Sequence, residues 1–211
     1  MTTLHNFFLE GPAGRIECLH KGLPDDREPG AAAVVCHPHP LFGGTMHNKV
    51  VHAAASAIVA AGIPVLRFNF RGAGLSEGKH DGGHGEQEDT AIVLDHLAAL
   101  YPGLPLLLVG YSFGAWVGMR AGIRDQRVKA MIGIGIPAAL YDFGFLGAAR
   151  VPIAFVQGTR DQFGPLPLLM ALAASIPGGA RLLTVKDAPH GFTGRIEELS
   201  ARVAEAIPEQ M

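Results

Sequence analysis

The sequence has few cysteines and no long hydrophobic run, and these absences exclude several classes of protein. Its two cysteines, Cys18 and Cys36, have neither a CxxC spacing nor enough partners for a disulfide framework, which favours a reducing compartment. The first ten residues lack the basic segment and apolar stretch of a signal peptide, and no apolar run reaches 18 residues. We therefore expect a cytoplasmic protein that does not span a membrane.

An excess of charge of one sign is also missing. Lysine and arginine total 17 against 19 aspartate and glutamate residues, a formal net charge of -2. Nucleic acids and acidic membrane surfaces are bound through strong basic fields, which this balance does not provide. Neither is an expected partner.

The composition that is present is typical of one globular domain. A chain of 211 residues that is 48% apolar can build a complete core, so we expect a single domain over residues 1–211. Short apolar segments separated by glycine and proline are typical of buried parallel strands. They cover residues 31–36, 63–70, 104–109, 128–134, 151–156 and 181–185.

Helical periodicity lies between these strands. Apolar residues share one helical face over 50–61 and 91–101, and further helices are expected at 113–123, 166–175 and 197–207. This alternation predicts an α/β fold with a mostly parallel sheet and helices on both faces. Residues 5–10 and 15–20 flank a Gly-Pro-Ala-Gly turn and predict an antiparallel hairpin at the sheet edge.

Two stretches of loop stand out. Residues 78–85 form the one low-complexity stretch, rich in glycine and histidine. About fifteen residues separate the strand ending near Gly135 from the strand starting at Val151, too few for a helical cap domain. We therefore expect a site that is open to solvent.

A G-x-S-x-G pattern occurs at Gly110, Ser112 and Gly114. The glycine and serine content of the chain gives roughly 0.09 matches by chance, so the pattern alone is a moderate signal. It follows a strand and opens a helix rich in small residues, the setting of a nucleophile raised on a sharp turn. Small flanking residues are needed there because neighbouring chain passes close to the turn. The context predicts that Ser112 is a nucleophile.

A serine nucleophile needs a histidine base and an orienting carboxylate. Asp161 follows the strand at 151–156 and His190 follows the strand at 181–185, so both occupy carboxyl ends of strands. Those ends share one edge of a parallel sheet with Ser112, and the order Ser, Asp, His is that of α/β-hydrolases. Asp142 is a serious alternative acid, whereas Asp187 lies too close to His190 along the chain to reach the far imidazole nitrogen.

An oxyanion hole requires two backbone N–H groups, and Phe113 supplies the one that follows the nucleophile. The second is expected from the loop 37–44, where the two prolines have no N–H to donate. His39 is the first choice, Leu41 the second, and Phe42 the remaining candidate.

Two other features of the sequence are interpreted without a metal-binding or catalytic role. His37, His39 and His47 are not interpreted as a metal site, because no acidic or thiolate ligand spacing accompanies them. Cys36 lacks a nucleophile turn and is interpreted as a buried, inert thiol.

Three runs of sequence carry a resemblance to a known family. They are HPHPLFGG at 37–44, FNFRG at 68–72 and GYSFG at 110–114. With them the chain resembles small, lidless bacterial α/β-hydrolases over nearly its whole length. The resemblance implies Ser112, Asp161 and His190 as a catalytic triad, a sheet of about eight strands, no cofactor, and carboxylesterase-like activity on small esters.

The expected function is therefore a serine esterase that cleaves small, short-chain acyl esters through an acyl-enzyme. Phe42, Leu140 and Phe143 are candidate pocket residues, although residues 140–146 fit equally well a surface helix that packs its own apolar face. One alternative is a thioesterase or peptidase-like hydrolase with the same triad. Another is a ligand-binding protein without catalysis, because one fold hosts many functions.

Overall fold

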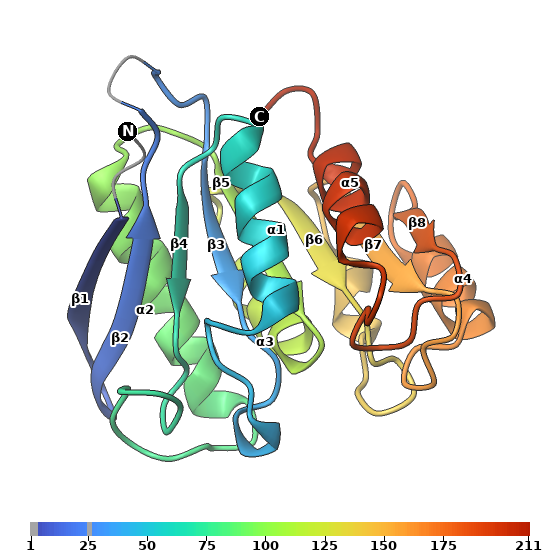
Figure 1. The fold of residues 1–211 in the computed structure, drawn as a ribbon, viewed down its shortest axis with the longest axis horizontal. Coiled ribbons are helices and arrows are strands. Elements are labelled where there is room, and N and C mark those ends of the chain that lie inside the picture. Colours follow the sequence, from blue (N-terminus) through green and yellow to red (C-terminus); the bar gives the residue numbers. More distant parts are fainter. Residues whose placement is uncertain (1–3, 25–26) are drawn as a thin grey trace.

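The computed structural model describes residues 4–24 and 27–211, in which eight strands form one sheet between two layers of helices (Figure 1). The strands are β1 (Leu4–Gly11), β2 (Gly14–Lys21), β3 (Ala32–Cys36), β4 (Val65–Phe68), β5 (Leu106–Tyr111), β6 (Val128–Ile134), β7 (Ile153–Gly158) and β8 (Arg181–Val185). The helices are α1 (Lys49–Ala60), α2 (His84–Leu100), α3 (Phe113–Gly122), α4 (Leu166–Ser175) and α5 (Ile196–Ala206), with short 3-10 helices η1 (Pro40–Phe42) and η2 (Gly144–Ala148).

The sheet has the order β1-β2-β4-β3-β5-β6-β7-β8. The hairpin of β1 and β2 is antiparallel and joins β4 in antiparallel register, while all pairs from β4 to β8 are parallel. The predicted edge hairpin and mostly parallel sheet are therefore confirmed. The carboxyl ends of the parallel strands lie on one edge of the sheet, and the loops after β3, β5, β7 and β8 meet there.

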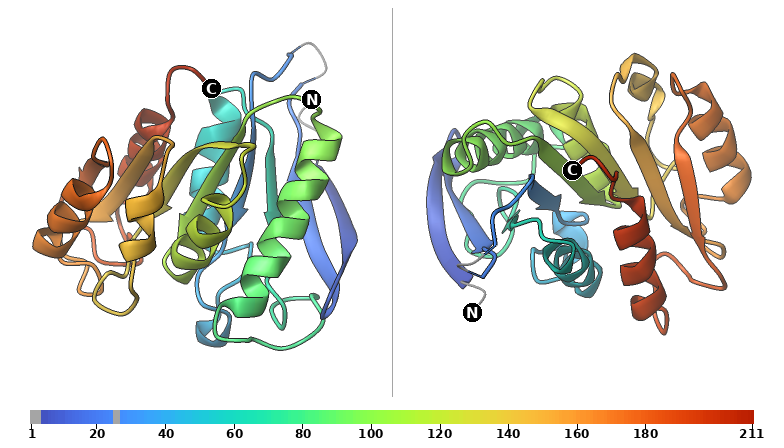
Figure 2. Two further views of the ribbon diagram at one scale, coloured as in Figure 1. Left: turned by 180° about the vertical axis from the view of Figure 1, so that it is seen from behind. Right: turned by 90° about the horizontal axis from the view of Figure 1, so that it is seen from above.

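Two hydrophobic cores lie on the two faces of the sheet. Helices α1 and α5 cover one face, and α2, α3 and α4 cover the other (Figure 2). Alternate residues of β3 serve the two cores: Ala32, Val34 and Cys36 pack on the α2 and α3 side, and Ala33 and Val35 pack on the α1 side. Such strands are buried on both faces, which explains their continuous apolar sequence.

Helix α2 begins earlier than the sequence predicts. It starts at His84, seven residues before the predicted start, and takes in the end of the Gly/His-rich loop. Apart from Gly85, the buried residues of its first turns are polar, namely Glu86, Asp89 and Thr90, so the apolar period begins only further along the helix. A prediction based on apolar periodicity misses such a start.

The connection between β6 and β7 holds η2 and no cap domain, as its length predicts. Among the described residues, none of the helices combines the length and the apolar character needed to cross a bilayer.

Candidate active site

Ser112 lies on the sharp turn between β5 and α3. Its backbone has φ 57° and ψ −122°, a left-handed conformation that is costly for a residue with a side chain. A Cβ on Gly114 would collide with the carbonyl oxygens of Cys36 and His37, and a Cβ on Gly110 would collide with the backbone at Gly114. Both flanking glycines are therefore required by the close approach of α3 to β3 and β5.

The structure joins Ser112, His190 and Asp161 in one series of hydrogen bonds. His190 Nε2 lies 2.9 Å from Ser112 Oγ, and His190 Nδ1 lies 2.8 Å from Asp161 Oδ2. An ionised carboxylate can only accept, so Nδ1 carries the ring proton and Nε2 is free to accept the serine hydroxyl. The arrangement can remove a proton from Ser112.

Asp161 is fixed by further hydrogen bonds. The backbone N–H of Phe163 donates to Oδ1 over 2.9 Å, and Gln157 Nε2 donates to Oδ2 over 2.8 Å. Gln157 is fully buried in β7, and its Oε1 accepts the N–H of Ile136. The sequence interpretation missed Gln157, although an amide in the apolar strand Ile153–Gly158 was a usable signal.

The two alternative acids are engaged elsewhere. Asp142 Oδ1 accepts the N–H of Gly144, and Asp187 forms an ion pair with Arg160 at 2.8 Å. Of the three candidate acids, only Asp161 contacts His190.

The predicted oxyanion donors differ in whether their N–H groups are occupied. The N–H of Leu41 donates to the Nδ1 of His39 over 3.2 Å, and the N–H of Phe42 donates to the carbonyl of His39 over 3.1 Å. In the described part of the chain, neither His39 N–H nor Phe113 N–H has a protein acceptor. These two groups are therefore available to a bound ligand.

A cavity of about 430 Å³ opens beside Ser112. It is lined by Pro38, His39, Phe42, Asn48, Tyr111, Ser112, Phe113, Leu140, Tyr141, Phe163 and His190. Phe42 and Leu140 thus line the cavity, but Phe143 does not. Phe143 is 3% exposed and packs in the core beside Phe145, because residues 140–148 form loop and 3-10 turns that direct Leu140 outward and Phe143 inward.

Comparison with known proteins gives consistent matches. The family model described as serine aminopeptidase, S33, matches residues 27–141. The crystal structure of XC6422 from Xanthomonas campestris, described as an α/β serine hydrolase without lid, has a TM-score of 0.89 and 32% identity, covering 98% of this chain and 94% of that chain. An α/β serine hydrolase homologue from Coxiella burnetii has a TM-score of 0.89 and 34% identity, covering 99% of both chains. The chain belongs to the small, lidless α/β serine hydrolases.

A curated relative is also similar to this hydrolase. The uncharacterized protein RP471 of Rickettsia prowazekii is 40% identical over 159 residues, which is 74% of the hydrolase and 66% of the relative. The hydrolase thus spans just under two thirds of that relative's length. The family model covers Ser112 but ends before Asp161 and His190. The placement of these two residues in the site is therefore based on the geometry of the hydrolase itself.

Burial controls the charge state of several groups around the hydrolase site. Burial lowers the pKa of His37 to about 3, so its ring is neutral. Burial raises the pKa of the Cys36 thiol to about 12, which keeps this thiol from competing as a nucleophile. Burial and the charge of Asp161 raise the pKa of Tyr111, whose hydroxyl donates to the carbonyl of His190.

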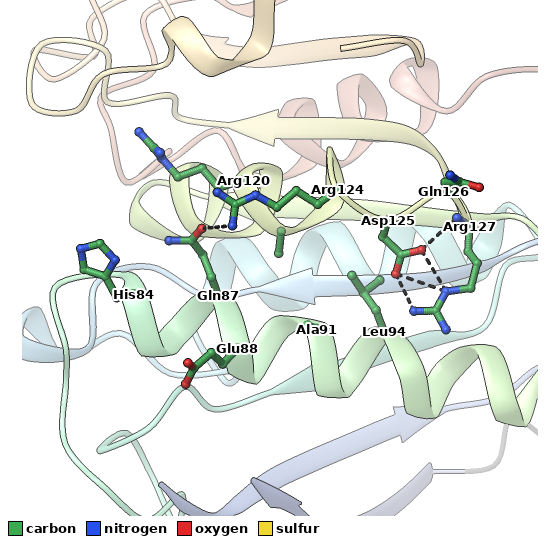
Figure 3. Close-up of a pocket in the computed structure, with 11 residues that line it drawn as sticks. His84, Gln87, Glu88, Ala91, Leu94, Arg120, Arg124, Asp125, Gln126 and Arg127 are labelled. Atoms are coloured by element: carbon green, nitrogen blue, oxygen red, sulfur yellow. Dashed lines mark hydrogen bonds and ion pairs between the residues drawn. The ribbon is translucent and has the colours of Figure 1, made fainter. Parts of the chain in front are cut away.

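A larger cavity of about 630 Å³ lies between α2 and α3, away from Ser112. Figure 3 shows Arg124 donating to Gln87 in this groove and Asp125 paired with Arg127 at its far end. None of the sequence-predicted site residues lines this groove. Although this groove is larger than the cavity beside Ser112, it is therefore not the candidate reaction site.

Proposed function

We propose that this hydrolase is a carboxylesterase that cleaves small, short-chain acyl esters, with Ser112 as the nucleophile. The observation that carries the proposal is the hydrogen-bonded series from Ser112 Oγ through His190 to Asp161, at 2.9 and 2.8 Å. A serine hydroxyl is a poor nucleophile until a base removes its proton, and a buried carboxylate orients that base.

The reaction follows from these positions. Ser112 Oγ attacks the ester carbonyl carbon while its proton passes to His190 Nε2, and Asp161 stabilises the imidazolium. The carbonyl oxygen becomes an oxyanion held by the N–H groups of Phe113 and His39. When the carbonyl re-forms, the bond to the alcohol breaks and His190 returns its proton to the leaving oxygen. Water, deprotonated by His190, then hydrolyses the acyl-enzyme.

The cavity lining favours a small neutral ester. Its volume of about 430 Å³ is at the lower end of the usual range for small-molecule sites. No aspartate or glutamate is among the described residues that line it. Recognition of the ammonium group of a free peptide N-terminus needs such an acid, so the lining disfavours an aminopeptidase.

The test is hydrolysis of p-nitrophenyl esters of increasing acyl length. We expect the best turnover on short chains, and a Ser112→Ala change should lower kcat roughly 10⁶-fold because no group replaces the nucleophile. Ser175→Ala is a matched control, since Ser175 is exposed at the end of α4. Near-normal activity of the Ser112→Ala variant would rule the proposal out.

Two other functions remain to be separated from this one. Parallel assays on acyl-CoA thioesters and on amides distinguish the esterase from a thioesterase or peptidase with the same residues. A fluorophosphonate probe reacts with an activated serine, so failure to label Ser112 would favour a ligand-binding protein without catalysis.

A further inference from the structure

The Gly/His-rich loop before α2 packs against the loop that carries His39. The ring of His80, from this loop, lies 4.6 Å from the ring of His39 and 5.4 Å from the ring of Phe113, measured between centroids. The His80 side chain is only 14% exposed. Its ring therefore packs near the side chains of the two residues whose N–H groups have no protein acceptor.

A buried carboxylate holds His80 from the other side. Glu86, in the first turn of α2, is fully buried, and its Oε1 lies 2.7 Å from His80 Nδ1. It also accepts the backbone N–H of Asp81 over 2.9 Å and of Gly83 over 2.8 Å. Among the described residues no lysine or arginine pairs with Glu86.

The His80–Glu86 contact is close but is not an aligned hydrogen bond. Although the two atoms are close, His80 Nδ1 has no hydrogen-bond partner of acceptable geometry in the described chain. Glu86 is itself fixed by Asp81 and Gly83, so it serves as a rigid anchor for the imidazole ring.

His39 connects this anchor to the oxyanion donors. The centroid of its ring lies 4.8 Å from that of Phe42 and 4.7 Å from that of Phe113, and its Nδ1 accepts the N–H of Leu41. The ring and the backbone of His39 therefore form one unit with η1. Because the ring accepts the N–H of Leu41, a shift of the ring would disturb the turn that His39 begins.

We propose that His80 is a positioning residue, which Glu86 holds against His39 and Phe113 so that their N–H groups point to the oxyanion. This inference rests on the proposed function, since it requires an oxyanion at that place. It gives the Gly/His-rich loop a role in transition-state binding, where a displacement of a donor by part of an ångström is costly.

The experiment compares His80→Ala, His80→Phe and His84→Ala in p-nitrophenyl acetate hydrolysis. His84 is the matched control, because it belongs to the same stretch but lines the separate groove of Figure 3. We expect His80→Ala to lower kcat about tenfold with KM within about twofold, since ground-state binding does not use the oxyanion donors fully. His80→Phe keeps a ring against His39 but loses the contact with Glu86, so its kcat should lie between those of the wild type and His80→Ala.

Inhibition by phenylboronic acid, which forms a tetrahedral anion on a reactive serine, supplies a second readout. In His80→Ala the inhibition constant should rise about tenfold, by the same factor as kcat falls. In His84→Ala it should stay unchanged. Glu86→Gln, which weakens the anchor, should likewise lower kcat and raise the inhibition constant. Thermal melting identifies any variant that fails to fold.

Failure of the positioning role of His80 can be told apart from failure of the proposed esterase function. If His80→Ala and His84→Ala both match the wild type in kcat, or if His80→Ala raises KM alone, the positioning role is wrong while the esterase stands. If the wild type itself has no activity that depends on Ser112, the proposed function has failed.

Discussion

His37 shows how one buried side chain ties the candidate site together. Its Nε2 accepts the N–H of Phe70 over 2.9 Å, and its Nδ1 donates to the carbonyl of Pro38 over 2.6 Å. The ring therefore bridges the ends of β3 and β4 and leaves no nitrogen for a metal ion. Both hydrogen bonds require the neutral ring with its proton on Nδ1.

The pKa of His37 predicts an acid-sensitive stability. Because burial lowers it from 6.5 to about 3, the unfolded state binds one more proton than the folded state between these values. The contribution of His37 to the stability of the fold is therefore fully present above pH 6.5, and it is lost as the pH falls from 6.5 to about 3. Urea unfolding should show that, between pH 7 and pH 5, the free energy of unfolding falls by about 2 kcal/mol more in the wild type than in His37→Gln. Equal losses in the two proteins would contradict this assignment.

At the scale of elements, a buried ion pair joins the loop after β4 to α2. Arg71 is 7% exposed and Asp89 is fully buried, and Arg71 Nη2 lies 2.7 Å from Asp89 Oδ1. The backbone N–H of Arg71 donates to the same carboxylate over 2.9 Å. The pair fixes the start of α2, and thereby the loop that carries His80, relative to the sheet.

Breaking this pair should be costly because it leaves an arginine buried without its main partner. We expect Asp89→Asn to lower the free energy of unfolding by about 3 kcal/mol. Glu198→Gln removes the exposed pair between Glu198 of α5 and Arg195, the residue before that helix, and should change the free energy of unfolding by less than about 1 kcal/mol. Denaturant unfolding of both variants measures the difference, and similar small losses would show that the buried pair adds little.

In the molecule as a whole, the connection between β6 and β7 holds no cap domain, and residues of the loops after β3 and β6 form walls of the cavity. Phe42 comes from η1 and is 87% exposed, and Leu140 comes from the connection after β6 and is 60% exposed. These side chains can bound an acyl group but cannot enclose it. Acyl-chain preference should therefore depend on single rim residues.

Leu140→Trp tests this dependence. The larger side chain narrows the cavity, so kcat/KM on the butyrate ester should fall about tenfold relative to the acetate ester. Leu75→Trp is the control, because Leu75 is similarly exposed, at 66%, but does not line the cavity. An unchanged ratio in Leu140→Trp would place the acyl group elsewhere.

The order of the elements, and the strand ends that carry Ser112, Asp161 and His190, can be predicted from the amino-acid sequence alone. Apolar periodicity reports which faces are buried, and a parallel sheet brings carboxyl ends of strands to one edge, so both features can be derived locally. The glycines around Ser112 are likewise a local requirement, because the turn is sharp wherever it occurs.

Which side chains come into contact depends on how the chain packs in three dimensions. The fold determines three such outcomes. It directs Phe143 into the core and Leu140 to the cavity, because the path of that loop depends on its packing against α3. It joins Asp161 to Gln157, and His39 to His80 and Glu86, through contacts that no repeat or spacing encodes. Residues far apart in the chain become neighbours when the helices cover the sheet, and the geometry of their contacts is fixed at that point.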